Sequence, residues 1–186
     1  MTLLTILVLA AVAYPLLASK SKVGLRFSDL PLSLDGMQYM DVAHYLDDGR
    51  NLNLPADAKA IRWLQDNVIG TPVVLEGRSP VYRWGSRISI YTGLPTILGW
   101  DVHQGQQRAG YPSMLQERST DVERAYSSVS SQEALAILRK YQVRWVVIGG
   151  LERAYYPAIG LDKFRTMPEL RLAYDADGVQ IYEVHS

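Results

Sequence analysis

Residues 143–157, VRWVVIGGLERAYYP, decide the fold class of this chain of 186 residues. The run Val143–Ile148 is short, continuous and apolar, and two glycines end it, which is typical of a buried strand. Glu152 and Arg153 follow the glycines. Because ligands of open α/β sheets bind beyond the carboxyl ends of the strands, we expect both charged side chains near a binding crevice.

A helix and another strand precede this one in the sequence. Pro55, an acidic residue at Asp57 and apolar residues at helical spacing predict a helix from Pro55 to just before Gly70. Residues 71–75, TPVVL, form a second buried strand that ends at Glu76. If the two strands are parallel neighbours, about 4.8 Å apart, Glu76 and Glu152 emerge at one edge of a sheet.

Residues 96–99 are a further strand candidate, and two helices follow them. The pairs Thr120 with Glu123 and Ser130 with Glu133 have the spacing of capping boxes, so we expect one helix to begin at each pair. A short helix around residues 161–167 comes next. Residues 170–174 and 179–184, joined by a turn, then predict a β-hairpin at the edge of the sheet.

These elements predict an α/β fold: a three-layer-like domain over residues 55–186, with a small mixed sheet and a C-terminal β-hairpin. One N-terminal transmembrane helix is expected before it, in residues 1–22. Residues 2–18 carry no charge and are about long enough to cross a hydrocarbon core of roughly 30 Å. Pro15 is expected to kink or end this helix. A cleaved signal peptide is the alternative, although no lysine or arginine precedes the apolar run.

Residues 23–54 are expected to connect the membrane segment to the domain. Within them, residues 37–46 place Met37, Met40 and Ala43 on one face of a short helix, where they would pack against the domain. Asp35 precedes a glycine and is expected in a turn.

Residues 75–108 are too polar for a core and too aromatic for an ordinary loop. Aromatic faces suit sugar rings and arginine forks suit phosphate, so this long loop is predicted to form a binding surface. A competing interpretation is that the loop folds on itself. Arg87 and Arg108 would then return over the sheet edge and pair with Glu76 and Glu152 in a structural ion-pair network.

Composition excludes several classes of function. Lysine plus arginine equals aspartate plus glutamate, at 19 each, so no overall positive field attracts nucleic acid. The chain has no cysteine, and its three histidines lie far apart without a metal-binding spacing, so we predict no metal site. The sequence contains no glycine-rich nucleotide fingerprint and no serine-hydrolase elbow, and we predict no cofactor. Glu76 with Asp101 or Glu152 could form a glycosidase pair, but no catalytic residue is assigned.

Residues 87–108, RISIYTGLPTILGWDVHQGQQR, together with VVLEG at 73–77 and VRWVVIGGLERAYYP, resemble the C-terminal part of the YYY membrane proteins of bacteria and archaea. These large polytopic proteins are similar to glycosyltransferases that use lipid-phosphosugars. The resemblance covers nearly the whole chain and implies an extracytoplasmic domain, whereas the basic flank at Lys20, Lys22 and Arg26 would favour the cytoplasm. The many membrane helices of the family, which hold the catalytic aspartate in such transferases, are missing, so we expect a fragment or one product of a split gene.

The resemblance and the polar-aromatic pattern together predict a substrate-binding set at the cell membrane, in a single-pass chain. The expected ligand is a membrane lipid, a lipid-linked sugar donor or a glycan acceptor. A polytopic membrane protein is a possible partner, which makes a non-catalytic interaction module the alternative function; a secreted hydrolase is a third. The predicted binding residues are Glu76, Arg87, Tyr91, Trp100, His103, Gln104, Gln107, Arg108, Glu152 and Arg153.

Overall fold

A computed structural model of the chain describes residues 2–26, 33–108 and 110–185. It divides into two compact units, Met1–Tyr39 and Met40–Ser186, which are described separately.

The first unit is dominated by one helix, α1, at Thr2–Arg26. The segment Thr2–Val23 has a mean hydropathy of 2.1 and is long and apolar enough to cross a membrane; no other helix of the described residues meets that test. A signal sequence has the same length and composition, so both interpretations of the segment stand. Pro15 does not end the helix as one expectation had it, because α1 continues through this residue to Arg26. The apolar run on either side is long enough to sustain the helix although proline removes one backbone hydrogen bond.

The predicted connector helix is largely wrong. Residues 37–46 contain a single 3-10 turn, η1 at Gln38–Asp41, and the start of β1 (Tyr45–Asp47), which forms a two-stranded hairpin with β2 (Arg50–Leu52). Asp48 and Gly49 join these strands with φ angles of 50° and 78°, the left-handed pair that tight hairpins require. The turn residues therefore override the helical spacing. The turn at Asp35 is present, since Asp35 Oδ1 accepts a hydrogen bond from the Met37 N–H at 2.8 Å.

The Met40–Ser186 unit is built on a four-stranded mixed sheet in the order β3-β4-β6-β5. Its strands are β3 (Val73–Leu75), β4 (Val143–Ile148), β5 (Leu170–Ala176) and β6 (Val179–Val184). The pair β3 and β4 is parallel, and the other two pairs are antiparallel. Both predicted strands and the C-terminal hairpin at the sheet edge are confirmed. Residues 96–99 contribute only one bridge, from Thr96 to Val74.

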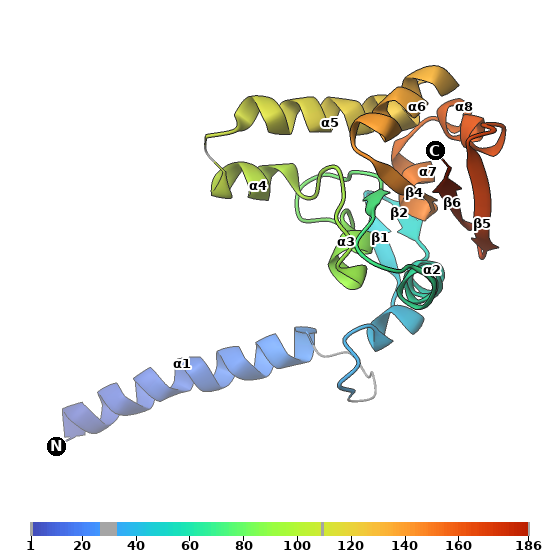
Figure 1. Ribbon diagram of the computed structural model, residues 1–186. Helices are drawn as coiled ribbons and strands as arrows, with labels where there is room; N and C mark the ends of the chain where they lie inside the picture. The colour runs from blue at the N-terminus through green and yellow to red at the C-terminus, as the bar shows by residue number, and fades with distance from the viewer. Residues whose placement is uncertain (1, 27–32, 109, 186) are drawn as a thin grey trace. The chain divides into compact units, whose positions relative to one another are not determined.

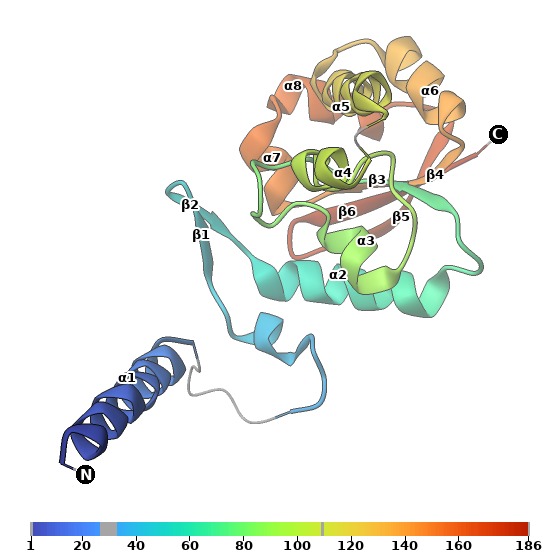
Figure 2. The same cartoon turned by 90° about the vertical axis from the view of Figure 1, so that its left-hand side faces the viewer.

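Helices cover both faces of the sheet, which confirms the three-layer α/β fold. Helix α2 (Leu54–Asn67) lies along one face, with Ala58, Ile61 and Leu64 buried as their spacing predicts. Helices α5 (Pro112–Ser127) and α6 (Ser131–Lys140) lie on the other face (Figure 2). Short elements α7 (Gly150–Tyr155), α8 (Ala158–Asp162) and η2 (Lys163–Arg165) join β4 to β5.

The two predicted capping boxes have different outcomes. Ser130 caps α6 as expected, and its hydroxyl accepts the Glu133 N–H at 3.2 Å. Thr120 instead lies inside α5, where its hydroxyl donates to the Gln116 carbonyl at 2.9 Å. The true start is Pro112, a residue type favoured in the first helical turn.

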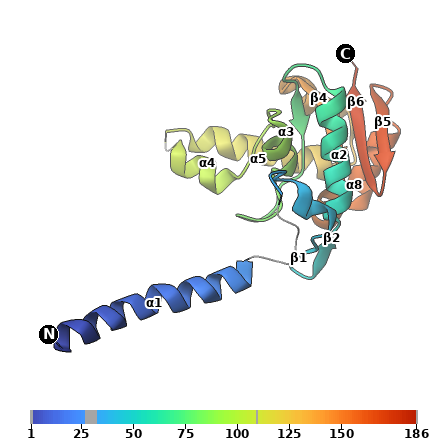
Figure 3. The ribbon, with the colours of Figure 1, turned by 90° about the horizontal axis from the view of Figure 1, so that it is seen from below.

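The segment between β3 and α5 is not one long loop, because it contains two short helices. These are α3 (Arg87–Thr92) and α4 (Asp101–Gln107). Helices α4 and α5 lie side by side and project from the rest of the unit (Figures 1 and 3). Much of the polar stretch that was expected to be a loop is therefore helical, in α3 and α4.

Candidate functional site

Glu76 and Glu152 lie at the same edge of the sheet, as predicted. Strand β3 is parallel to β4, with Leu75 opposite Val146, so both strands end on the same side. Glu76 directly follows β3, and Glu152 lies in α7 just after β4. Both side chains are buried, with 1% and 0% of their surface exposed.

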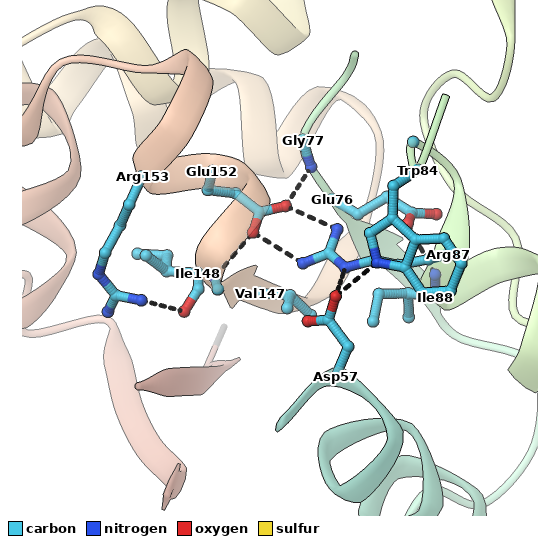
Figure 4. A network of polar contacts seen from close by, with 12 residues as sticks. Asp57, Glu76, Gly77, Trp84, Arg87, Ile88, Val147, Ile148, Glu152 and Arg153 are labelled. Carbon is cyan, nitrogen blue, oxygen red and sulfur yellow. Dashed lines mark hydrogen bonds and ion pairs between the residues drawn. The ribbon is translucent and has the colours of Figure 1, made fainter. Parts of the chain in front are cut away.

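Arg87 connects this edge to helix α2. Its Nε donates to Asp57 Oδ2 at 2.8 Å, and its Nη1 and Nη2 donate to the two carboxylate oxygens of Glu152 at 3.1 and 2.9 Å (Figure 4). This bidentate pair is the strongest geometry between arginine and a carboxylate. Arg87 is itself only 1% exposed, so the pair is desolvated.

The carboxylates also hold backbone amides in place. Glu76 accepts hydrogen bonds from the N–H groups of Ile88 and Ser89 at 2.8 and 3.0 Å, in the first turn of α3. Glu152 accepts from Gly77 and Gly149, both at 2.7 Å, at the ends of β3 and β4. The network thus fixes α3 against both parallel strands. Of the ion pairs that the competing interpretation expected, it contains the pair of Arg87 with Glu152, whereas Glu76 accepts from backbone amides.

The guanidinium of Arg87 faces the carboxyl groups of Asp57, Glu76 and Glu152. The pKa values of these three groups do not all shift in the same direction. Burial raises the pKa of Glu152, but the charge and hydrogen bonds of Arg87 outweigh burial and hold that pKa below its usual range. For Glu76 and Asp57 burial dominates, and it raises both pKa values although Arg87 opposes it. Asp57 Oδ1 has no hydrogen-bond partner among the described residues. Asp57 is therefore the member least compensated for burial.

These shifts predict opposite pH effects for two carboxyl groups of one network. The pKa of Glu152 is below its unfolded value of 4.5, so its stabilisation is present above pH 4.5 and is lost as the pH falls through the folded pKa. The pKa of Glu76 is raised, so its contribution is present below pH 4.5 and is lost as the pH rises through the folded pKa. We therefore expect the destabilisation caused by Glu152→Gln to shrink in acid, and that caused by Glu76→Gln to shrink toward neutral pH. Urea unfolding from about pH 2.5 to 7 covers both losses, and parallel pH profiles of the two variants would contradict the assignment.

Sequence reasoning missed two members of the network. Asp57 was assigned only to a helix N-terminus, and Trp84 only to a group of rings. In the structure the indole N–H of Trp84 donates to Asp57 Oδ2 at 2.6 Å. A second cluster was also missed: buried Asp47 accepts hydrogen bonds from Arg83 and from the hydroxyl of Tyr155. Local patterns carry no signal for either, because the partners are far apart in sequence.

The other predicted binding residues are divided between three places. Tyr91 lies on α3 and packs on Trp84, with ring centroids 6.1 Å apart. Arg153 donates to the carbonyl of Ile148 at 3.3 Å and to that of Gly178, so it ties α7 to the hairpin. Trp100 caps α4, and the remaining four lie on this helix or at its end: His103, Gln104, Gln107 and Arg108.

Helix α4 presents its polar side chains to solvent. His103, Gln107 and Arg108 are exposed, and the side-chain nitrogens of His103 and Gln107 lie 3.0 Å apart. Trp100 is half-buried, and its indole N–H donates to the Gly85 carbonyl at 2.9 Å. The expectation that Arg108 pairs with the carboxylates is wrong, because α4 carries it away from the sheet edge to another hollow.

Three hollows lie in series along α4. The first, ≈ 270 Å³, is lined by Arg78, Ser79, Pro80, Val81, Asp101, Val102, Glu123, Tyr155 and Tyr156. The second, ≈ 240 Å³, shares Asp101 and Val102 with the first, and it adds Gly105, Arg108, Pro112, Leu115, Gln116 and Ser119. The third, ≈ 410 Å³, shares Arg108 and Leu115 with the second, and it adds Gln104, Tyr111, Met114 and Arg118. Asp101 and Val102 therefore join the first hollow to the second, and Arg108 borders both the second and the third.

The first hollow combines rings with an ion pair. Arg78 pairs with Asp101, and the backbone N–H of Arg78 donates to the Tyr156 hydroxyl at 2.8 Å. Asp101 Oδ1 also accepts a hydrogen bond from the Val102 N–H at 2.8 Å, in the first turn of α4. No group of three histidine or acidic side chains in the described parts of the chain is arranged to hold a metal ion. The chemistry available here is hydrogen bonding and ring contact.

Comparisons with known proteins found a likeness in structure but none in sequence. No family model matches the sequence, and no curated protein matches it. Among solved structures, the chain is similar to the C-terminal globular domain of an oligosaccharyltransferase from Archaeoglobus fulgidus. The identity is 16%, the TM-score is 0.43, and the match covers 68% of this chain and 94% of that chain. The candidate site therefore rests on the side chains described above.

Proposed function

We propose that the Met40–Ser186 unit is the extramembrane ligand-binding domain of a glycosyltransferase-like membrane protein. Its ligand is a lipid-linked phosphosugar or a glycan acceptor, bound along α4. The observation that carries this proposal is the continuous surface that leads from the Arg78 and Asp101 pair to Arg108. The chain also contains a segment able to cross a membrane. The motif resemblance to the YYY membrane proteins suggests the lipid-phosphosugar class.

The first hollow has the chemistry that a sugar requires. Tyr155 is half-buried and offers part of its ring to the apolar side of a pyranose, whereas Tyr156 is 5% exposed and forms the floor against Tyr126. The guanidinium of Arg78 and the carboxylate of Asp101 offer donors and acceptors for its hydroxyl groups. No residue in this hollow is assigned a catalytic role. Transfer itself would need the polytopic membrane part that the resemblance implies.

The buried network would support this surface without touching the ligand. Arg87 and Glu76 fix α3, which follows directly on the turn at Gly85. Gly85 in turn receives the indole N–H of Trp100 at the start of α4, and its own N–H donates to Ser79 Oγ at 2.8 Å. A rigid support of this kind lowers the entropy that ordering a site costs on binding. Direct ligand contact by Glu76, Arg87 and Glu152 stays a prediction, and their burial favours a supporting role.

Binding of a prenyl phosphosugar tests the proposal. We expect the full chain in phosphatidylcholine nanodiscs to bind farnesyl mannosyl phosphate, in which the phosphate joins mannose to the prenyl chain. Asp101→Asn should weaken this binding about tenfold. The substitution keeps an oxygen that can accept from the Val102 N–H but removes the charge, and a hydrogen bond to a charged group contributes roughly 1.5–3 kcal/mol. Asp162→Asn, at an exposed residue of α8, is the matched control. Absence of binding to both the phosphosugar and free oligosaccharides would refute the proposal.

A second candidate function is an interaction module for a polytopic membrane partner. It is favoured by apolar side chains exposed on α4 and α5, namely Val102, Tyr111 and Met114. Purification from the native host in mild detergent distinguishes the two functions. Recovery of a polytopic protein together with a chain that binds neither the phosphosugar nor a free oligosaccharide would favour the interaction module.

A further inference from the structure

The hollow at the C-terminal end of α4 has a different chemistry from the first one. Six residues line it: Gln104, Arg108, Tyr111, Met114, Leu115 and Arg118. We propose that it binds the phosphate group of an amphiphile, with Arg108 and Arg118 on the phosphate and Tyr111, Met114 and Leu115 against the hydrocarbon chain. This inference extends the proposed function, and the position given below for the sugar rests on that function. The phosphate site itself can be tested without a sugar.

Two guanidinium groups and no carboxylate line this hollow. Arg108 is exposed, and its guanidinium has no hydrogen-bond or ion-pair partner within the described parts of the chain. Arg118 donates from Nη1 to the Ile97 carbonyl at 3.1 Å and lies 5.8 Å from the ring centroid of Tyr141. The other N–H groups of the Arg118 guanidinium make no hydrogen bond within the described residues. Both arginines can therefore offer forked donors to phosphate oxygens.

The acidic side chains on the same helix as Arg118 are partly neutralised elsewhere. Glu117 and Asp121 both accept hydrogen bonds from Lys140, at 2.5 and 2.6 Å, so these three groups keep one net negative charge against the two positive charges of Arg108 and Arg118. Asp101, at the opposite end of α4, pairs with Arg78. The hollow thus keeps an uncompensated positive charge, although the chain as a whole has a formal net charge of zero. Such a local excess attracts an anion.

The remaining lining is apolar and partly open. Tyr111 and Met114 are 58% and 41% exposed, and Leu115 forms the floor at 9%. At ≈ 410 Å³ the hollow is larger than its two neighbours and falls in the range of small-molecule sites. Single exposed apolar residues are ordinary on protein surfaces. These apolar side chains lie beside two guanidinium groups that pair with no carboxylate in the described residues. The combination matches a ligand with a charged head and an apolar chain.

The series of hollows gives the ligand a direction. Arg108 lies at the C-terminal end of α4 and Asp101 at its start, about 10 Å apart along a helix of seven residues. The phosphate would therefore lie at Arg108, the sugar would extend toward Asp101, and the hydrocarbon chain would leave over Met114. The simpler explanation is that Arg108 only complements the carbonyl dipoles at the helix end. That explanation predicts no anion binding.

Three probes test the site on the full chain in phosphatidylcholine nanodiscs: farnesyl phosphate, inorganic phosphate and farnesol. We expect farnesyl phosphate to bind at least tenfold more tightly than either of the others, because it alone carries both groups. Arg108→Ala should weaken farnesyl phosphate binding about tenfold, and Arg108→Lys should restore part of it. The affinity should fall with rising salt, since the interaction is between charges at a partly exposed site. Arg165→Ala, at an exposed arginine of η2, is the matched control and should change nothing.

The outcomes separate this inference from the proposed function. Equal binding of farnesol, or binding unaffected by Arg108→Ala, would overturn the phosphate site. Inorganic phosphate that binds as tightly as farnesyl phosphate would show a free-anion site and overturn the amphiphile. If farnesyl phosphate binds through Arg108 but mannose adds no affinity and Asp101→Asn has no effect, the phosphate site stands and the sugar function fails. If phosphosugar binding depends on Asp101 but not on Arg108, the sugar function stands and the phosphate site fails.

Discussion

Replacing Arg87 by methionine is expected to unfold the Met40–Ser186 unit, or to lower its free energy of unfolding by about 3–5 kcal/mol. The methionine fills much of the space but leaves the carboxylates of Asp57 and Glu152 buried without their cation. Removing one partner of a buried ion pair costs more than the pair itself contributes, because the other charge stays desolvated. Urea unfolding followed by tryptophan fluorescence measures the loss.

Two variants establish the cause of that loss. Arg165→Met removes an exposed arginine and should change the free energy of unfolding by no more than about 0.5 kcal/mol. Adding Glu152→Gln to Arg87→Met should recover part of the stability, because it removes one unpaired charge. A loss below about 1 kcal/mol for Arg87→Met alone would show that the network contributes little to the fold.

The second large effect is expected at Gly160, in α8. A Cβ atom at this position would lie 2.3 Å from the Tyr126 carbonyl oxygen and 2.7 Å from that of Ser127, both at the end of α5. The same helix end is held by buried Lys163, whose ammonium donates to the carbonyls of Ala125 and Gly160, each at 2.6 Å. Gly160→Ala must push α8 away from α5 and loosen these bonds. We expect a loss of about 3 kcal/mol in the free energy of unfolding, from overpacking together with weakened capping.

Gly105, inside α4, is the matched comparison for Gly160. A Cβ there meets only Leu115 Cδ1, at 3.7 Å, an ordinary contact distance. Alanine is the better helix former by roughly 1 kcal/mol, so Gly105→Ala should raise or preserve the free energy of unfolding. Thermal unfolding followed by circular dichroism compares the two variants. Similar melting temperatures would show that the close approach of α8 to α5 is not maintained in solution.

Local sequence signals determined most of the elements of this protein. Pro55 and its helical spacing predicted α2, Ser130 predicted the start of α6, and the apolar run before Gly149 predicted β4. These signals act over a few residues, through proline geometry, side-chain caps and hydrophobic periodicity. Where two local signals competed, the structure decided between them. The Asp48 and Gly49 turn prevailed over a helical pattern, and Pro112 prevailed over Thr120.

The arrangement of the candidate site was only partly available from the sequence. Parallel neighbours would place Glu76 and Glu152 at one sheet edge, and the structure has them so. Which arginine meets them was not available, because Arg87 is 30 residues from Asp57 and 65 from Glu152, and only packing brings them together. The sequence treated Arg87 and Arg108 alike, as arginines of one polar-aromatic stretch. The tertiary structure buries Arg87 among carboxylates as an internal support, and it leaves Arg108 on a projecting helix, because α3 packs on α2 and is held to the sheet edge by Glu76, whereas α4 packs on α5.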